Sequence, residues 1–116
     1  MLDKHPCGIL TALVNPFQKD ESIDYGVWKD VINNFILSGI DGLFWVRSGA
    51  EFYATTEAGR REATRFVVSA VRGRVPVYAQ VGAVTTRESF ALARHAEGEG
   101  ADYLVVITPC YIRPTD

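Results

Sequence analysis

Residues 75–81 read VPVYAQV, and this stretch decides the fold class of the chain. It is short, almost continuously apolar and rich in β-branched residues. Strands that are buried on both faces of a parallel sheet have this composition, whereas half-exposed strands alternate apolar and polar residues. Pro76 stands near the start of the stretch, where a missing backbone donor is tolerated. We therefore expect residues 75–81 to form a strand inside a parallel sheet.

Three other segments have the same character. They read ILTALV at residues 9–14, GLFWV at 42–46 and YLVVI at 103–107. No linker rich in proline, glycine or serine separates them, so residues 1–116 are expected to form one α/β unit without a second domain.

Apolar residues spaced three and four apart predict a helix in each intervening stretch. Capping residues and glycine stop signals set the ends of these helices. The predicted helices cover about Asp24 to Ser38, the residues between Thr55-Thr56-Glu57 and Gly73, and the residues from Thr85-Thr86 to Gly98 or Gly100. Phe90 is expected to face the core and His95 the solvent. Arg60, Arg61 and Arg65, interleaved with glutamates, are expected to form a solvated face.

Strand and helix alternate, which predicts parallel strands joined by right-handed crossovers. Two architectures fit this order. One is a small open doubly wound sheet, and the other is the first four strands and three helices of a (β/α)8 TIM barrel, truncated after its fourth strand. The long loops at residues 15–23 and 47–55 favour the barrel, because a barrel builds its active site from the loops that follow its strands.

Composition excludes several classes of function. Of the 116 residues, 47% are hydrophobic and 22% are charged, with a formal net charge of −2. Nothing resembles a basic nucleic-acid surface, a membrane span or a secretory signal, so a cytoplasmic protein is expected. Cys7 and Cys110 are too few for a disulfide framework, and neither they nor His5 and His95 have metal-ligand spacing. No nucleotide-binding glycine motif is present.

Four segments resemble the dihydrodipicolinate synthase / N-acetylneuraminate lyase family, in the right order and at the right spacing. They are GILTALVNPF at residues 8–17, DGLF at 41–44 followed by SGAEFYA at 48–54, RVPVYA at 74–79 followed by Val81-Gly82, and GAD at 100–102 followed by VVITPCYIRP at 105–114. Together they cover nearly the whole chain.

The resemblance implies a (β/α)8 barrel and Schiff-base chemistry between a lysine and pyruvate or another 2-oxo acid. The iminium stabilises a carbanion beside it, so neither a metal nor an organic cofactor is implied. The attacking lysine must be deprotonated, which burial promotes. The resemblance also implies a homo-oligomer in the full-length form.

The same resemblance assigns roles to residues in two loops. Ser48 matches a hydroxyl that relays protons, because a hydroxyl both donates and accepts a hydrogen bond. It also matches a substrate-binding position. Gly49 falls on a second hydroxyl position, which helps to hold the substrate carboxylate, so only its backbone N–H remains as a donor. Tyr111 matches a tyrosine that completes the proton relay in the neighbouring subunit of family dimers.

The chain also departs from the family pattern. Arg47 and Ala50 replace glycines, Asn15 replaces a threonine, and Gln80 stands where a small residue is usual. Arg47 adds charge beside the expected carboxylate site. It predicts either a substrate with an additional acidic group or a site that is no longer under functional constraint.

None of the three lysines fits the Schiff-base role. Lys4 precedes the first strand, Lys29 lies on the first predicted helix, and Lys19 has polar and acidic neighbours that keep its ammonium charged. The catalytic lysine is therefore expected outside this chain, and the chain alone is expected to be inactive. Two alternatives stay open: a catalytically inactive remnant, and a small open-sheet binding module.

Overall fold

The structure is a computed structural model, and it describes residues 7–45 and 56–108. Within these ranges four strands alternate with three helices, which confirms the predicted order. The elements are β1 (Leu10–Ala12), α1 (Tyr25–Leu37), β2 (Gly42–Trp45), α2 (Glu57–Val71), β3 (Val77–Gln80), α3 (Thr86–Glu99) and β4 (Tyr103–Val105). The strands are shorter than the apolar segments that predicted them, because parallel pairing covers only part of each segment.

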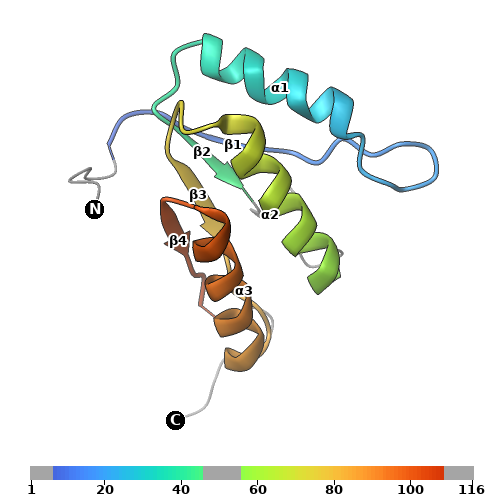
Figure 1. Ribbon diagram of the computed structural model, residues 1–116, viewed down its shortest axis with the longest axis vertical. Coiled ribbons are helices and arrows are strands. Elements are labelled where there is room, and N and C mark those ends of the chain that lie inside the picture. Colours follow the sequence, from blue (N-terminus) through green and yellow to red (C-terminus); the bar gives the residue numbers. More distant parts are fainter. Residues whose placement is uncertain (1–6, 46–55, 109–116) are drawn as a thin grey trace.

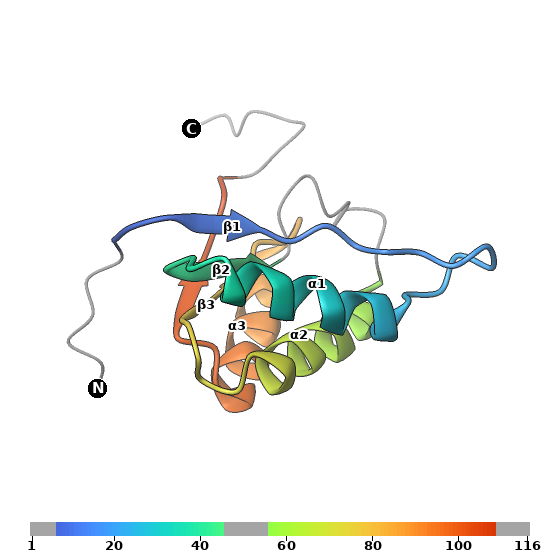
Figure 2. The same ribbon diagram turned by 90° about the horizontal axis from the view of Figure 1, so that it is seen from above.

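The strands form one parallel sheet in the order β1-β2-β3-β4 (Figure 1). All three helices lie on the same face of this sheet (Figure 2). A doubly wound sheet would carry helices on both faces and would reverse its strand order at a switch point. Consecutive parallel strands with helices on one face are the arrangement of a TIM barrel, so the barrel prediction is confirmed.

Each helix begins at a side chain that caps its first turn. The carboxylate of Asp24 accepts a hydrogen bond from the backbone N–H of Val27, and the hydroxyl of Thr56 accepts one from that of Gly59. Thr85 and Glu88 form a reciprocal capping box at the start of α3. These bonds satisfy backbone donors that no helical carbonyl can reach, which explains why the helices start where they do.

The main core lies between the sheet and the helices α1 and α2. Trp28 of α1 contacts Trp45 of β2 edge to face, with 4.7 Å between the ring centroids, and stacks on Phe66 of α2 at 5.6 Å. The buried members of this core are Leu13, Trp28, Ile32, Leu43, Trp45, Ala63, Val67, Val71 and Val77. A smaller cluster under α3 consists of Ala79, Val81, Leu92 and Ala96. Several of the largest fully buried side chains, including Leu43 and Trp45 of β2 and Trp28 of α1, therefore lie in the main core.

One packing prediction for α3 is wrong. Phe90 is 62% exposed, whereas Leu92 and Ala96 are buried as expected. Two residues along an α-helix differ by about 200° in direction, so Phe90 and Leu92 cannot face the same core. The apolar stripe of α3 that meets the sheet runs through Leu92 and Ala96. The guanidinium of Arg94 lies over the exposed Phe90 ring.

Candidate functional site

The residues predicted to act on substrate lie outside the described part of the chain. Arg47, Ser48 and Gly49 follow β2 in the sequence, and Tyr111 follows β4. Their roles in catalysis and substrate binding therefore stay predictions. Both groups of residues follow the carboxyl end of a strand in the sequence. In a parallel sheet the carboxyl ends of all strands lie at one edge.

A buried arginine joins the start of α2 to the carboxyl end of β3. Nη2 of Arg60 donates to the backbone oxygen of Gln80 at 3.0 Å, to its side-chain Oε1 at 3.0 Å and to the backbone oxygen of Gly82 at 3.1 Å. Trp45, the last residue of β2, pairs with Ala79, so these two carbonyl groups lie beyond the end of β2. Arg60 thus satisfies acceptors that the sheet ladder does not reach.

This contact overturns the prediction that Arg60 belongs to a solvated face. Only 7% of Arg60 is exposed, whereas Arg61 forms a partly exposed ion pair with Glu57. Burial lowers the pKa of Arg60, and the carboxylates of Glu57 and Glu88 oppose that shift. An arginine side chain stays protonated in proteins, so a positive charge is held beside the carboxyl end of β3.

A sequence signal for this contact does exist. Arg60 stands three and four residues before Ala63 and Thr64, which are buried. It is therefore in phase with the buried stripe of α2, unlike Arg61. Gln80 is the polar residue in an otherwise apolar strand, and a buried amide requires a hydrogen-bond partner. The two residues are far apart in the sequence, so the pairing itself follows from the fold.

A second hydrogen-bonded chain fixes the first turns of α2 against β2. The indole N–H of Trp45 donates to the hydroxyl of Thr64 at 2.9 Å, and that hydroxyl donates to the backbone oxygen of Arg60 at 2.8 Å. These contacts attach α2 to the ends of β2 and β3. In the sequence, Ser48 stands between these two elements, β2 and α2.

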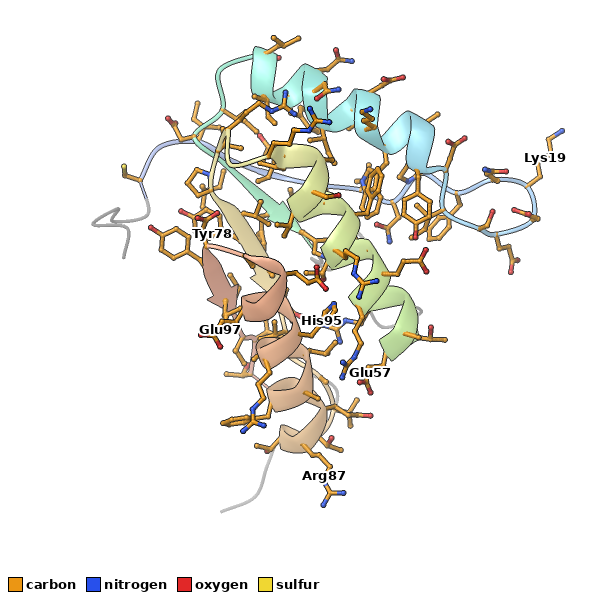
Figure 3. All side chains as sticks on the ribbon, viewed as in Figure 1. Lys19, Glu57, Tyr78, Arg87, His95 and Glu97 are labelled. Atoms are coloured by element: carbon orange, nitrogen blue, oxygen red, sulfur yellow. The ribbon has the colours of Figure 1, made fainter. Side chains whose placement is uncertain are left out.

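The prediction for His95 is also wrong. Its side chain is 13% exposed, and Nε2 lies 2.9 Å from the backbone oxygen of Arg61 and 3.8 Å from the carboxylate of Glu99. Figure 3 shows His95 between α3 and α2. Glu99 also binds Arg65 across the same helix pair. His95 therefore helps to hold the two helices together, and this place is on the outer side of the sheet.

The two lysines in the described part of the chain are both exposed. Lys19 is exposed in the loop between β1 and α1, and Figure 3 shows its side chain pointing away from the sheet. Lys29 is exposed on α1. Among residues 7–45 and 56–108 no cluster of histidine, cysteine, aspartate and glutamate could hold a metal ion. In the same ranges, no helix has the length and apolar character of a membrane span.

The sequence as a whole identifies the family. A sequence model of the dihydrodipicolinate synthetase family matches residues 5–116. The chain belongs to this family. The resemblance of the four strand motifs is thereby confirmed.

Curated members of the dihydrodipicolinate synthetase family include enzymes with different names. A 4-hydroxy-tetrahydrodipicolinate synthase of Chelativorans sp. is 40% identical over 107 residues, which are 92% of this chain and 36% of that protein. The probable 2-dehydro-3-deoxy-D-pentonate aldolase YjhH of Escherichia coli is 38% identical over 104 residues, 90% of this chain and 35% of that protein. The chain thus spans little more than a third of the relatives that it matches.

Solved structures of the family superimpose closely on this chain. YagE of Escherichia coli, a family member in complex with pyruvate, matches with a TM-score of 0.90 and 35% identity, over 93% of this chain and 36% of its own. Dihydrodipicolinate synthase of Aquifex aeolicus matches with a TM-score of 0.89 and 30% identity, with the same coverage. The four strands and three helices correspond to the N-terminal part of these barrels.

Proposed function

We propose that this chain supplies part of the active site of a pyruvate-dependent aldolase or lyase. The enzyme forms a Schiff base with pyruvate or another 2-oxo acid through a lysine that lies outside residues 1–116. The observation that carries this proposal is the similarity to YagE, whose structure holds pyruvate and whose N-terminal part has the same fold. The carboxyl ends of the described strands and the buried Arg60 lie at the same edge of the sheet. Barrel enzymes bind their substrates at this edge.

The chemistry of the proposed site follows from its residue types. The protonated Schiff base withdraws electrons from the adjacent carbon, so a carbon–carbon bond can form or break there. The hydroxyls of Ser48 and Tyr111 pass the proton that this step releases or requires. The backbone N–H of Gly49 and the guanidinium of Arg47 hold carboxylate oxygens of the substrate. None of these steps requires a metal or an organic cofactor.

We also propose where the enzyme is located in the cell and that it forms an oligomer. A cytoplasmic homo-oligomer fits an enzyme of this family, in which Tyr111 serves the site of a neighbouring subunit. The alternative of an inactive remnant rests on Arg47 and Ala50, which replace glycines. The alternative of an independent open-sheet module does not fit the consecutive strand order and the single layer of helices.

Reductive trapping tests this function. The complete gene product is treated with pyruvate and borohydride, and the protein mass is measured. We expect one stable adduct per subunit. Ser48→Ala should lower turnover by about two decades or more, since general acid–base groups contribute that much. Ser38→Ala is the matched control, because Ser38 caps the carboxyl end of α1 and its hydroxyl donates to the backbone oxygen of Asn34. Absence of an adduct in the wild-type protein would favour the inactive remnant.

A further inference from the structure

Gln80 is the last residue of β3, and its side-chain amide is buried but only half satisfied. The residue is 4% exposed. Its Oε1 accepts a hydrogen bond from Arg60, whereas its Nε2 has no hydrogen-bond partner among the atoms that the structure describes. A guanidinium only donates hydrogen bonds, so Arg60 fixes which end of the amide is the oxygen. The nitrogen is therefore turned away from Arg60, and no residue within 7–45 and 56–108 accepts a hydrogen bond from it.

Strand geometry gives the side of the sheet on which this amide lies. Val77, Ala79 and Val81 pack against the helices. Because side chains alternate along a strand, Gln80 belongs to the opposite face, which becomes the interior of a barrel. A Cβ atom on Gly82 would lie 2.9 Å from Nε2 of Gln80. The amide nitrogen therefore lies beside Gly82, toward the carboxyl end of the strand and the mouth of the barrel.

In the described part of the chain, no side-chain acceptor reaches the amide nitrogen. Val105 of β4 is the register partner of Gln80, and Ile107 lies next to Gly82. A small number of polar donors in an apolar surround is the usual composition of a ligand site. An oxygen atom that reaches Nε2 must come from the inner face, since Ala79, Val81 and Leu92 close the helix-covered face.

The charge of Arg60 decides which kind of oxygen fits. A cation that binds Oε1 polarises the amide and strengthens its N–H groups as donors, and its field favours an anionic acceptor. We propose that Gln80, positioned by Arg60, determines substrate specificity by donating its amide N–H groups to a carboxylate oxygen of the bound 2-oxo acid. This inference rests on the proposed function and deepens it. Gln80 touches the substrate, and Arg60 acts through Gln80.

The side-chain amide of Gln80 can be observed directly. The chain contains two glutamines, Gln80 and Gln18, and Gln18 is exposed in the loop after β1. In the complete gene product, labelled with nitrogen-15, the Gln80 amide resonance should shift in a saturable way as pyruvate is added. The Gln18 amide resonance should not shift. Gln80→Glu assigns the resonance because it removes that amide.

Two substitutions separate binding from packing. Gln80→Glu keeps an acceptor for Arg60 but places a negative charge where the substrate carboxylate is proposed to bind. It should weaken pyruvate binding about tenfold or more and should affect the neutral analogue pyruvamide by less than about threefold. Gln80→Leu keeps the volume and removes the donors, and it should also weaken pyruvate binding about tenfold. Circular dichroism verifies that each variant is folded, and Gln18→Leu is the control.

The outcomes distinguish this inference from the proposed function. Each of three results overturns the inference. The Gln80 amide resonance does not respond to pyruvate, Gln80→Glu weakens pyruvate and pyruvamide binding equally, or Gln80→Leu leaves the pyruvate affinity unchanged. An amide that is satisfied by an ordered water would give that result. Borohydride trapping of the wild-type protein is a separate measurement, and it tests Schiff-base formation. A saturable shift without an adduct supports Gln80 as a carboxylate-binding residue and counts against the Schiff-base function.

Discussion

Strands β2 and β4 have similar apolar sequences but very different surroundings. In β2, Leu43 and Trp45 are 0% and 1% exposed. In and just after β4, Leu104 and Val106 are 44% and 65% exposed. β2 pairs with β1 and β3 and lies under α1 and α2, whereas β4 is the outer strand of the described sheet and pairs there with β3. The difference teaches that burial in this sheet depends on the neighbours of a strand more than on its own composition.

The described sheet leaves apolar side chains exposed at both of its edges. Exposed apolar side chains gather at both outer strands: Ile9, Leu10 and Val14 around β1, and Leu104, Val106 and Ile107 around β4. A barrel closes such edges with further strands, and its next helix covers the outer face of β4. The matched 107 residues are only 36% of the Chelativorans relative, which is roughly two and a half times as long as this chain.

The largest expected effect contrasts Trp28 with Leu104. Trp28→Ala removes a fully buried ring that contacts Trp45 and Phe66, and it should cost about 3–5 kcal/mol in the free energy of unfolding. Leu104→Ala in the isolated 116-residue chain should cost less than about 1 kcal/mol, since surface substitutions have small effects. Urea unfolding measures both values.

Leu104→Ala should have a larger effect in the complete gene product than in the 116-residue chain. In the complete gene product, a following strand and helix are expected to bury Leu104, and the same substitution should then cost about 2–3 kcal/mol. Equal costs in the short chain and in the complete product would contradict this account of the β4 edge.

A second contrast concerns two adjacent arginines of α2. Arg60→Met leaves the oxygens of Gln80 and Gly82 without their charged donor, and it should destabilise the complete gene product by about 2–3 kcal/mol. Arg61→Met is the matched control. It breaks a partly exposed ion pair with Glu57 and should cost about 0.5 kcal/mol or less. Thermal unfolding of the two variants side by side decides the matter, and similar melting temperatures would count against a structural role for Arg60.

These contrasts show what the sequence could predict. The order of strands and helices followed from apolar periodicity, because each element is a local pattern. His95 and Arg60 were predicted wrongly, because their surroundings come from elements distant in the sequence, whereas Phe90 was placed on the wrong face of its own helix. Arg60 meets Gln80 across the α2–β3 connection, and His95 meets the backbone of Arg61 on another helix. The roles of Ser48, Gly49, Arg47 and Tyr111 stay predictions from the family resemblance.

The smallest expected effect concerns substrate choice. Arg47→Gly in the complete gene product should weaken binding of a 2-oxo acid with a second carboxylate by about one to two decades, and it should change pyruvate binding far less. A bidentate arginine–carboxylate pair in a partly buried site accounts for that selectivity. Arg72→Gly is the control, because Arg72 already has a left-handed backbone (φ 53°) at the far end of α2. Equal weakening of both ligands would reject a selective role for Arg47.

The central claim is that this chain holds part of a Schiff-base site whose lysine lies elsewhere. Treatment with pyruvate and borohydride, followed by mass spectrometry of the protein and its peptides, tests that claim most directly. The account predicts no specific, saturable adduct on the 116-residue chain. It predicts one adduct per subunit on the complete gene product, at a lysine outside residues 1–116. Stoichiometric trapping at Lys19 in the 116-residue chain would contradict the account.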